Sequence, residues 1–326
     1  MLAFAVRRIL YSIPVLIVSS FVIFALGSAS ADPLAPLREK NPPAPQNVID
    51  AEYVRLHLDQ PLLQRYFSWL GGIFTGDFGP SVVSTANIGH DLGDRFLVTI
   101  RLIALAMVLA LILAVVIGVL TAVKQYSKFD YAATFVGFLF LAMPAFWFAI
   151  LLKQAGISFN SALGTQAIYT IGQSSVPPPR GAGPYVVDII GHMILPTISL
   201  ALISYAAWSR FTRASMLEVM NSDYVRLARA KGLPRRTVMV KHGLRTALIP
   251  LTTVTALDIA SIIGGAVVTE TVFQWKGMGD YLLTSIRTND VYATASWLLV
   301  AATVVIAFNL IADLLYGVLD PRIRYA

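Results

Sequence analysis

The sequence predicts an all-α membrane protein with six transmembrane helices. Of its 326 residues, 56% are hydrophobic and only 13% are charged, and the mean hydropathy is +0.69. Soluble domains carry about 25% charged residues, and a soluble chain of this composition would expose too much apolar surface to water. The net charge of +7 is better explained by membrane topology than by nucleic-acid binding. We therefore expect a lipid bilayer, and no nucleic acid, as a partner.

A helix that crosses a hydrocarbon core needs about 20 mostly apolar residues. Six stretches meet this requirement: 9–31, 102–123, 131–152, 189–209, 246–269 and 291–312. Pro144, Pro196 and Pro250 lie inside three of them, which membrane helices tolerate when neighbouring groups satisfy the freed carbonyls. The first stretch resembles a secretory signal, but its length favours an uncleaved anchor over a cleaved one.

Basic residues near the ends of the spans predict the orientation of the chain. They gather at the N-terminal end, after the second span, after the fourth span and in the tail, so we expect both termini to be cytoplasmic. Four segments follow: 1–31, the N-terminal end and first helix; 32–96, an external segment; 97–320, a five-helix core; and 321–326, a cytoplasmic tail. The external segment is proline-rich at first and then predicts a short helix near Val48–Leu58.

The cytoplasmic loop 210–247 contains a short helix with clear end signals, Asp223–Lys231. Ser222 (or Asn221) suits the N-cap, Gly232 suits the position after the last turn, and Pro234 prevents continuation. A helix of this length is marginal in water, so it needs a surface to lie on.

Two surfaces fit this helix. Its basic residues suit anionic lipid headgroups, whereas a face formed by Tyr224, Leu227 and Ala228 suits a cytosolic protein. The small side chains of Ala228 and Ala230 would allow close approach of another backbone.

Motifs for enzyme chemistry are absent from the sequence. It has no cysteine and no phosphate-binding G-x-x-x-x-G-K-[ST], H-E-x-x-H or G-x-S-x-G motif. The four histidines show no ligand spacing, so we expect no metal site, no cofactor in this chain and no catalytic residues. Any energy source for work by this protein is expected on another chain.

The loop resembles a known family. The residues Arg226-Leu227-Ala228-Arg229-Ala230-Lys231-Gly232, followed by Leu248-Ile249-Pro250, resemble the EAA loop of ABC importer permeases, in particular the dipeptide/oligopeptide branch. Other stretches of the same branch are matched by 58–62, 76–79, 192–196, 264–279 and 309–322. Lys276 stands where the family usually has proline.

The resemblance implies a type I ABC importer permease fold in the inner (cell) membrane. It implies four kinds of partner: a second homologous permease, two cytoplasmic ATPase domains that hold ATP and Mg, an external solute-binding protein and the bilayer. The protein would import di- or oligopeptides without being an enzyme. The residues implied to couple it to the ATPases are Asp223, Tyr224, Val225, Arg226, Leu227, Ala228, Arg229, Ala230, Lys231, Gly232 and Leu233.

Two carboxylates within the fifth span are candidates for the translocation path, because an ionisable group in a membrane span is costly. Asp258 is either bonded to Thr or Ser hydroxyls or exposed to a peptide amine. Glu270 is closer to the external end, where we expect it to meet water, as a cap for the following turn or as a ligand contact.

Two alternatives to the peptide importer remain. One is a permease for another solute of the same branch, such as a nickel chelate, glutathione or an antimicrobial peptide. The other is an ion-driven carrier or channel that acts without ATPases, which the absence of an evident inverted repeat disfavours.

Overall fold

The computed structural model describes residues 2–83 and 87–319. These residues form helices joined by turns, with no strand among them, as the composition predicts. Two compact units are present. The first comprises residues 100–275 with 308–319, and the second comprises 2–99 with 276–307. The predicted tail, 321–326, lies outside the described residues.

Four helices are long and apolar enough to cross a membrane as single elements. They are α1 (Leu2–Ser30), α5 (Ile88–Val123), α8 (Ala182–Met220) and α14 (Val291–Leu319). Two further candidates are bent pairs: α6 (Lys128–Ala142) with α7 (Ala145–Leu163), and η1 (Val238–Leu244) and α11 (Arg245–Leu257) with α12 (Ile259–Phe273). Counting each pair as one span gives the six that the sequence predicts.

The predicted third span is not one continuous helix. The axes of α6 and α7 differ by 108°. Met143 between them has an extended backbone (φ −79°, ψ 130°), and Pro144 stands at the N-cap of α7. A residue that precedes proline is pushed out of the helical region by the proline ring, so the helix ends at Ala142. Pro196, by contrast, lies inside the continuous α8.

The predicted fifth span is also interrupted, but its break, unlike that of the third span, does not lie at its proline. Pro250 lies inside α11, which follows the π-helix η1. The interruption occurs at Asp258, where α11 ends and α12 begins, and the two arms are bent by 49°.

In the second unit, an aromatic cluster packs the N-terminal helices. It is built by Phe24 of α1, Tyr66 and Trp69 of α4 (Leu62–Ile73), and Tyr292 of α14. Trp69 donates its indole N–H to Ser296 Oγ at 3.1 Å. Residues 276–307, including α13 (Met278–Arg287), thus pack with a segment far earlier in the chain.

Two short helices of the same unit share a small apolar core. They are α2 (Ala35–Arg38) and α3 (Gln46–Arg55), and Leu34, Ile49 and Leu56 are buried together beside them. The helix predicted near Val48–Leu58 is therefore present, beginning and ending a few residues earlier.

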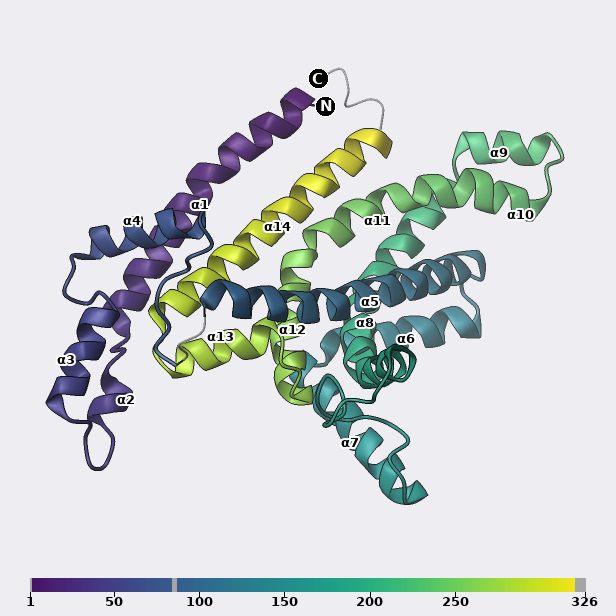
Figure 1. Ribbon diagram of the computed structural model, residues 1–326. Helices are drawn as coiled ribbons and strands as arrows, with labels where there is room; N and C mark the ends of the chain where they lie inside the picture. The colour runs from purple at the N-terminus through teal and green to yellow at the C-terminus, as the bar shows by residue number, and fades with distance from the viewer. Residues whose placement is uncertain (1, 84–86, 320–326) are drawn as a thin grey trace. The chain divides into compact units, whose positions relative to one another are not determined.

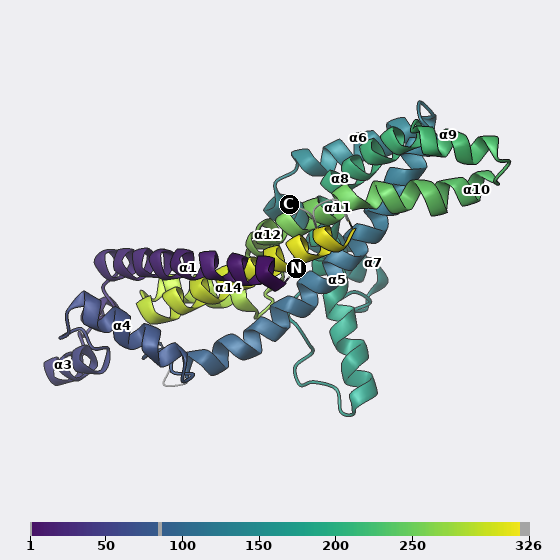
Figure 2. The same cartoon turned by 90° about the horizontal axis from the view of Figure 1, so that it is seen from above.

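In the first unit, α8 is the element around which the others pack. It contacts α6, α7, α11 and α12, and Gly118 of α5 lies so close to it that an added Cβ would meet Ser209 O at 2.7 Å. Beyond α8 the chain forms α9 (Asp223–Ala230) and α10 (Arg235–Thr237). Figures 1 and 2 both show α9 and α10 side by side as a hairpin.

Candidate functional site: helix α9 and its support

The start of α9 differs from the predicted capping. Ser222 occupies the N-cap position (φ −70°, ψ 152°), but it makes no side-chain cap. Its hydroxyl instead donates to Val219 O at 2.6 Å, back into the end of α8. Asn221 behaves similarly, because its side-chain amide donates to Leu217 O at 3.0 Å. Both polar side chains therefore hydrogen-bond to carbonyls in the last turn of α8. Neither caps the N-terminus of α9, so the expectation of a side-chain cap there is wrong.

The end of α9 is formed as the sequence predicts. Gly232 has a left-handed backbone with φ +75°. Its N–H donates to Arg229 O at 3.0 Å, and the N–H of Leu233 donates to Ala228 O at 3.4 Å. These two bonds define a Schellman motif, which satisfies carbonyls left free by the last turn. The helix is one residue shorter than predicted, with Lys231 as its C-cap.

One face of α9 is buried against the rest of the first unit. Val225 and Ala228 lie in a cluster with Met216 and Val219 of α8 and with Ala122, Val238 and Ala247. Residues three apart share a helix face, so these two fasten α9 to the ends of α5, α8, η1 and α11. The expectation that Ala228 faces a partner together with Tyr224 and Leu227 is therefore wrong: Ala228 is 6% exposed and packs on its own chain, where its small size permits the close approach.

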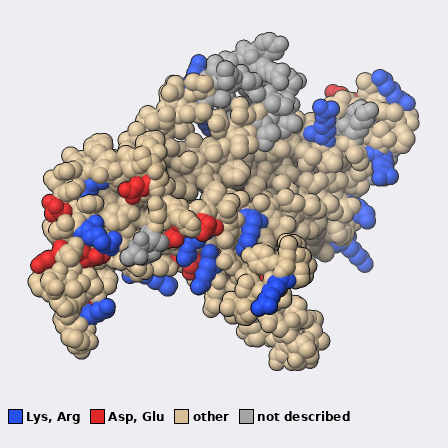
Figure 3. Space-filling model, in the orientation of Figure 1, with Lys and Arg blue, Asp and Glu red and all other residues tan. Residues whose placement is uncertain are grey.

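The opposite face of α9 is uncovered in this chain. Tyr224 is 44% exposed and Leu227 57% exposed, and Ala230 is also exposed. Arg226, 3.8 Å from the Asp223 carboxylate, is largely in solvent. Figure 3 shows mainly Lys and Arg around α9 and α10. Tyr224 and Leu227, surrounded by basic side chains, form a surface suited to a protein partner whose binding groove has acidic residues at its rim.

Asp258 lies at the break between α11 and α12, and its partner differs from the predicted one. Its Oδ2 accepts a hydrogen bond of 2.6 Å from Trp208 Nε1 of α8. Two nearby threonine hydroxyls bond to backbone carbonyls instead: Thr252 donates to Ile249 O at 2.7 Å and Thr255 to Leu251 O at 2.9 Å. The carboxylate therefore joins the helix break to α8 through an indole.

Glu270 does not meet water in this chain. Its side chain is fully buried (0% exposed), and the residue has an interaction partner within the protein. Its carbonyl accepts a bond of 2.7 Å from the Trp275 N–H, which closes the turn after α12. The expectation of a water-exposed carboxylate is wrong. Asp258 and Glu270 thus occupy different surroundings, one at a helix break and one buried near the end of α12.

An ion pair between a half-buried arginine and a buried aspartate could not be predicted from the sequence. Arg213 of α8 donates to Asp130 of α6 through Nε at 3.0 Å and through Nη2 at 2.9 Å. The Tyr126 N–H adds a third bond to the same carboxylate at 3.0 Å. The only sequence signal was an acidic residue three positions after Ser127, which caps α6, and nothing local relates it to Arg213.

These features define a class of protein: a helical, multi-span membrane protein that carries a short, basic, half-uncovered helix beyond one of its spans. Two family models match this chain. "Binding-protein-dependent transport system inner membrane component" covers residues 114–325, and the N-terminal model of the same transport systems covers residues 1–89. The chain belongs to this family. It is therefore a multi-pass inner-membrane transport subunit and not an enzyme.

Curated relatives match over essentially the whole chain. The oligopeptide transport system permease protein OppB of Mycobacterium tuberculosis (strain ATCC 25618 / H37Rv) is 38% identical over 99% of each chain. AppB of Bacillus subtilis (strain 168), also named an oligopeptide transport system permease, is 37% identical over 100% of each. The dipeptide transport system permease protein DppB of Escherichia coli (strain K12) is 34% identical over 100% of this chain and 99% of its own.

A solved structure supports the fold. A chain of the MetNI methionine ABC transporter in inward-facing conformations aligns with a TM-score of 0.56, covering 70% of this chain and 96% of its own. At 14% identity the likeness concerns the fold alone, and it confirms the predicted ABC importer permease fold. Permeases of this kind work with ATPases and binding proteins.

Proposed function

We propose that this chain is the membrane-spanning subunit of an ATP-driven importer of di- or oligopeptides. The support is the agreement of the relatives, which are named oligopeptide or dipeptide permeases and match along the full chain. The subunit would form half of the translocation pathway beside a second, homologous permease. Two cytoplasmic ATPase domains would bind ATP and Mg, and an external binding protein would deliver the peptide.

Within this assembly, α9 with its C-terminal turn, residues 223–233, is the coupling element. The observation that carries the assignment is the division of α9 into a buried face, Val225 and Ala228, and an exposed apolar face, Tyr224 and Leu227. An ATPase domain that grips the exposed face would act on the ends of α5, α8, η1 and α11 through the buried one. Such a helix would transmit movement because one face contacts the ATPase domain and the other packs on the transmembrane helices.

The proposed sidedness follows from the charges. The basic α9 and α10 region belongs in the cytoplasm with both termini, and residues 32–96 then lie outside the membrane. That external segment, which includes α2, α3 and α4, is the proposed docking face for the solute-binding protein. Residues 97–320 form the five-helix core.

For the two carboxylates of the fifth span we propose different roles. Asp258 acts chiefly as a structural acceptor for Trp208, since the 2.6 Å bond occupies one of its oxygens. Glu270 acts within the protein interior near the end of α12. Neither needs to bind peptide tightly, because a permease depends on transient contacts.

The test substitutes Leu227→Asp in the assembled complex and measures retention of the ATPase subunits and peptide-stimulated ATP hydrolysis in proteoliposomes. Val176→Asp is the matched control: it makes the same kind of change at an exposed side chain that lies outside both α9 and residues 32–96. We expect Leu227→Asp to lose ATPases or uncouple hydrolysis from uptake, and Val176→Asp to retain the ATPases and coupled uptake. Normal uptake and retention with Leu227→Asp would refute the coupling assignment.

The comparisons do not favour the alternatives. The hypothesis of an ion-driven carrier or channel would be supported if the chain purified from its native membrane as a stable assembly without ATPases. Another solute of the same branch would be indicated if ATPases co-purified but no peptide stimulated their hydrolysis.

A further inference from the structure

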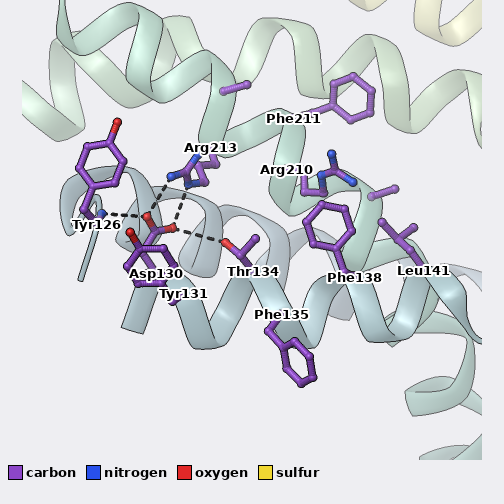
Figure 4. A pocket seen from close by; sticks show the side chains of 12 residues that line it. Tyr126, Asp130, Tyr131, Thr134, Phe135, Phe138, Leu141, Arg210, Phe211 and Arg213 are labelled. Carbon is purple, nitrogen blue, oxygen red and sulfur yellow. Dashed lines mark hydrogen bonds and ion pairs between the residues drawn. The ribbon is translucent and has the colours of Figure 1, made fainter. Parts of the chain in front are cut away.

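A groove lies between α6 and α8 in the first unit. It has a volume of about 900 Å³. Figure 4 shows Phe135, Phe138 and Leu141 of α6 along one wall and Arg210, Phe211 and Arg213 of α8 along the other. At one end lie Tyr126, Asp130 and Arg213, and toward the other lie Phe138 and Leu141, with Arg210 beside Phe138.

The polar end coincides with the expected level of a membrane interface. Arg210 directly follows the apolar stretch 189–209, and Tyr131 begins the apolar stretch 131–152. Tyr126 and Tyr131 both line the groove, and tyrosine is enriched where headgroups meet the hydrocarbon. From this level, Thr134, Phe138 and Leu141 continue along α6 into the span.

The two arginines of the groove differ in how their charges are satisfied. Arg213 is held by Asp130 through two hydrogen bonds, and this pair is internally neutral. The guanidinium of Arg210 lies 4.3 Å above the Phe138 ring, and no ion pair with a carboxylate joins it in the described part of the chain. Arg210 thus leaves one net positive charge in the groove, beside Phe138 and about one helical turn from Arg213.

The apolar wall is uncovered. Phe135 is 69% exposed and Phe138 48% exposed, and Leu141 and Phe211 are similarly open. In the bilayer such side chains are covered either by lipid chains or by another protein helix. A single unbalanced cation beside an apolar channel is complementary to an anionic amphiphile, not to an apolar helix.

We propose that this groove binds one anionic phospholipid. The phosphate would lie at Arg210, the Tyr126 and Tyr131 hydroxyls would face the remainder of the headgroup, and an acyl chain would run along Phe138 and Leu141. Arginine suits this role because its planar guanidinium donates several hydrogen bonds to phosphate oxygens while its other face stays stacked on an aromatic ring.

The site would also affect the support of α9. Arg213 lies one helical turn before Met216, which is fully buried in the cluster that holds Val225 and Ala228. A lipid that spans α6 and α8 at this level braces the two helices beside the α9 anchor. This lipid is a bound structural partner and is independent of which solute the protein transports.

The experiment uses native mass spectrometry of the assembled complex, taken from nanodiscs that contain phosphatidylglycerol and phosphatidylcholine in equal amounts. We expect the wild-type complex to retain phosphatidylglycerol preferentially and Arg210→Gln to weaken that retention roughly tenfold, the effect of losing one charge-assisted contact. Arg210→Lys should keep much of it. Lys128→Gln is the control, because it removes the same charge from an exposed residue next to the groove but outside its lining.

Several further results would support or overturn the proposal that the groove binds an anionic phospholipid. Equal retention by Arg210→Gln and Lys128→Gln, or equal retention of both lipids by the wild type, would overturn the proposal. A photoreactive residue at Phe135 should label lipid. Labelling of the second permease chain instead would show that a protein helix fills the groove. Displacement of the lipid by millimolar inorganic phosphate would show that the groove recognises a free anion rather than an amphiphile.

Discussion

The indole Nε1 of Trp208 donates a hydrogen bond of 2.6 Å to Oδ2 of Asp258. The bond joins the middle of α8 to the residue at which α11 gives way to α12. Trp208 is fully buried, so its N–H has no access to water when the bond is lost. The interruption of the fifth span is therefore tied to a neighbouring helix by one polar contact.

Trp208→Phe removes this donor while keeping an aromatic ring. We expect it to lower the stability of the purified protein by about 1–3 kcal/mol, the usual cost of leaving a polar group inside the protein without its hydrogen-bond partner. Asp258→Asn should cost less, because the amide oxygen still accepts the bond. Thermal unfolding in detergent measures both. Unchanged stability with Trp208→Phe, together with altered peptide uptake by Asp258→Asn, would instead assign Asp258 to the translocation path.

Gly118→Ala tests the close approach of α5 and α8. An added Cβ would lie 2.7 Å from both Ser209 O and Thr212 Cβ, so the helices must separate, at a cost of about 1–3 kcal/mol. Gly93→Ala is the matched control on the same helix, because nothing lies within 4 Å of its Cβ position. There alanine should stabilise the helix by up to about 1 kcal/mol. Opposite signs in thermal unfolding are expected, and destabilisation by both variants would contradict the packing argument.

Gly232→Ala tests the end of α9. With φ +75° the position disfavours a Cβ by about 1–2 kcal/mol, and the Schellman bonds of Gly232 and Leu233 would weaken. We expect faster hydrogen exchange at those two amides and reduced coupling of ATP hydrolysis to uptake. Gly164→Ala is a control of the same kind, with φ +68° at the end of α7; it should leave exchange in α9 unchanged.

Low pH should loosen α3 from the segment that follows α4. Arg55 is hydrogen-bonded to Glu52 and donates through Nη2 to Ser81 O at 2.7 Å. The hydrogen bond from Arg55 lowers the pKa of Glu52 below its ordinary 4.5. A carboxylate with a lowered pKa stabilises the fold fully above its unfolded pKa, and this stabilisation is lost as the pH falls through the folded pKa. Hydrogen exchange within Gln46–Arg55 should therefore rise below about pH 4.5.

Glu52→Gln provides the comparison for the pH prediction. It should raise exchange in α3 at neutral pH and remove most of the acid-induced increase. An acid response of the same size in this variant would assign the effect to another group, such as Asp290, which accepts bonds from Ser81 Oγ and the Val82 N–H.

Local sequence signals predicted the parts of the structure that depend on local chemistry. Gly232 and Pro234 predicted the end of α9, and the lengths of the apolar stretches predicted the six candidate spans. What could not be predicted depends on distant partners. Nothing near Asp258 in sequence points to Trp208, 50 positions earlier, and nothing near Asp130 points to Arg213, 83 positions later.

The face of α9 shows the same limit on a smaller scale. Spacing correctly indicates that Tyr224, Leu227 and Ala228 are neighbours on the helix, but an eight-residue helix has apolar or small residues on more than one side. Only the positions of Met216 and Ala247 decide that Val225 and Ala228 are the covered pair. Similarly, Pro144 predicts a kink, whereas the 108° turn depends on the extended backbone of Met143.

The division of α9 also separates two kinds of evolutionary change. Substitutions at Val225 or Ala228 must be matched by the residues packed against them, so these positions change only together with the scaffold. Tyr224, Leu227 and Ala230 meet no such constraint from their own chain. Under the proposed coupling role of α9, a permease of this kind could acquire a new ATPase subunit by altering a few outward side chains, while the residues packed beneath them stay the same.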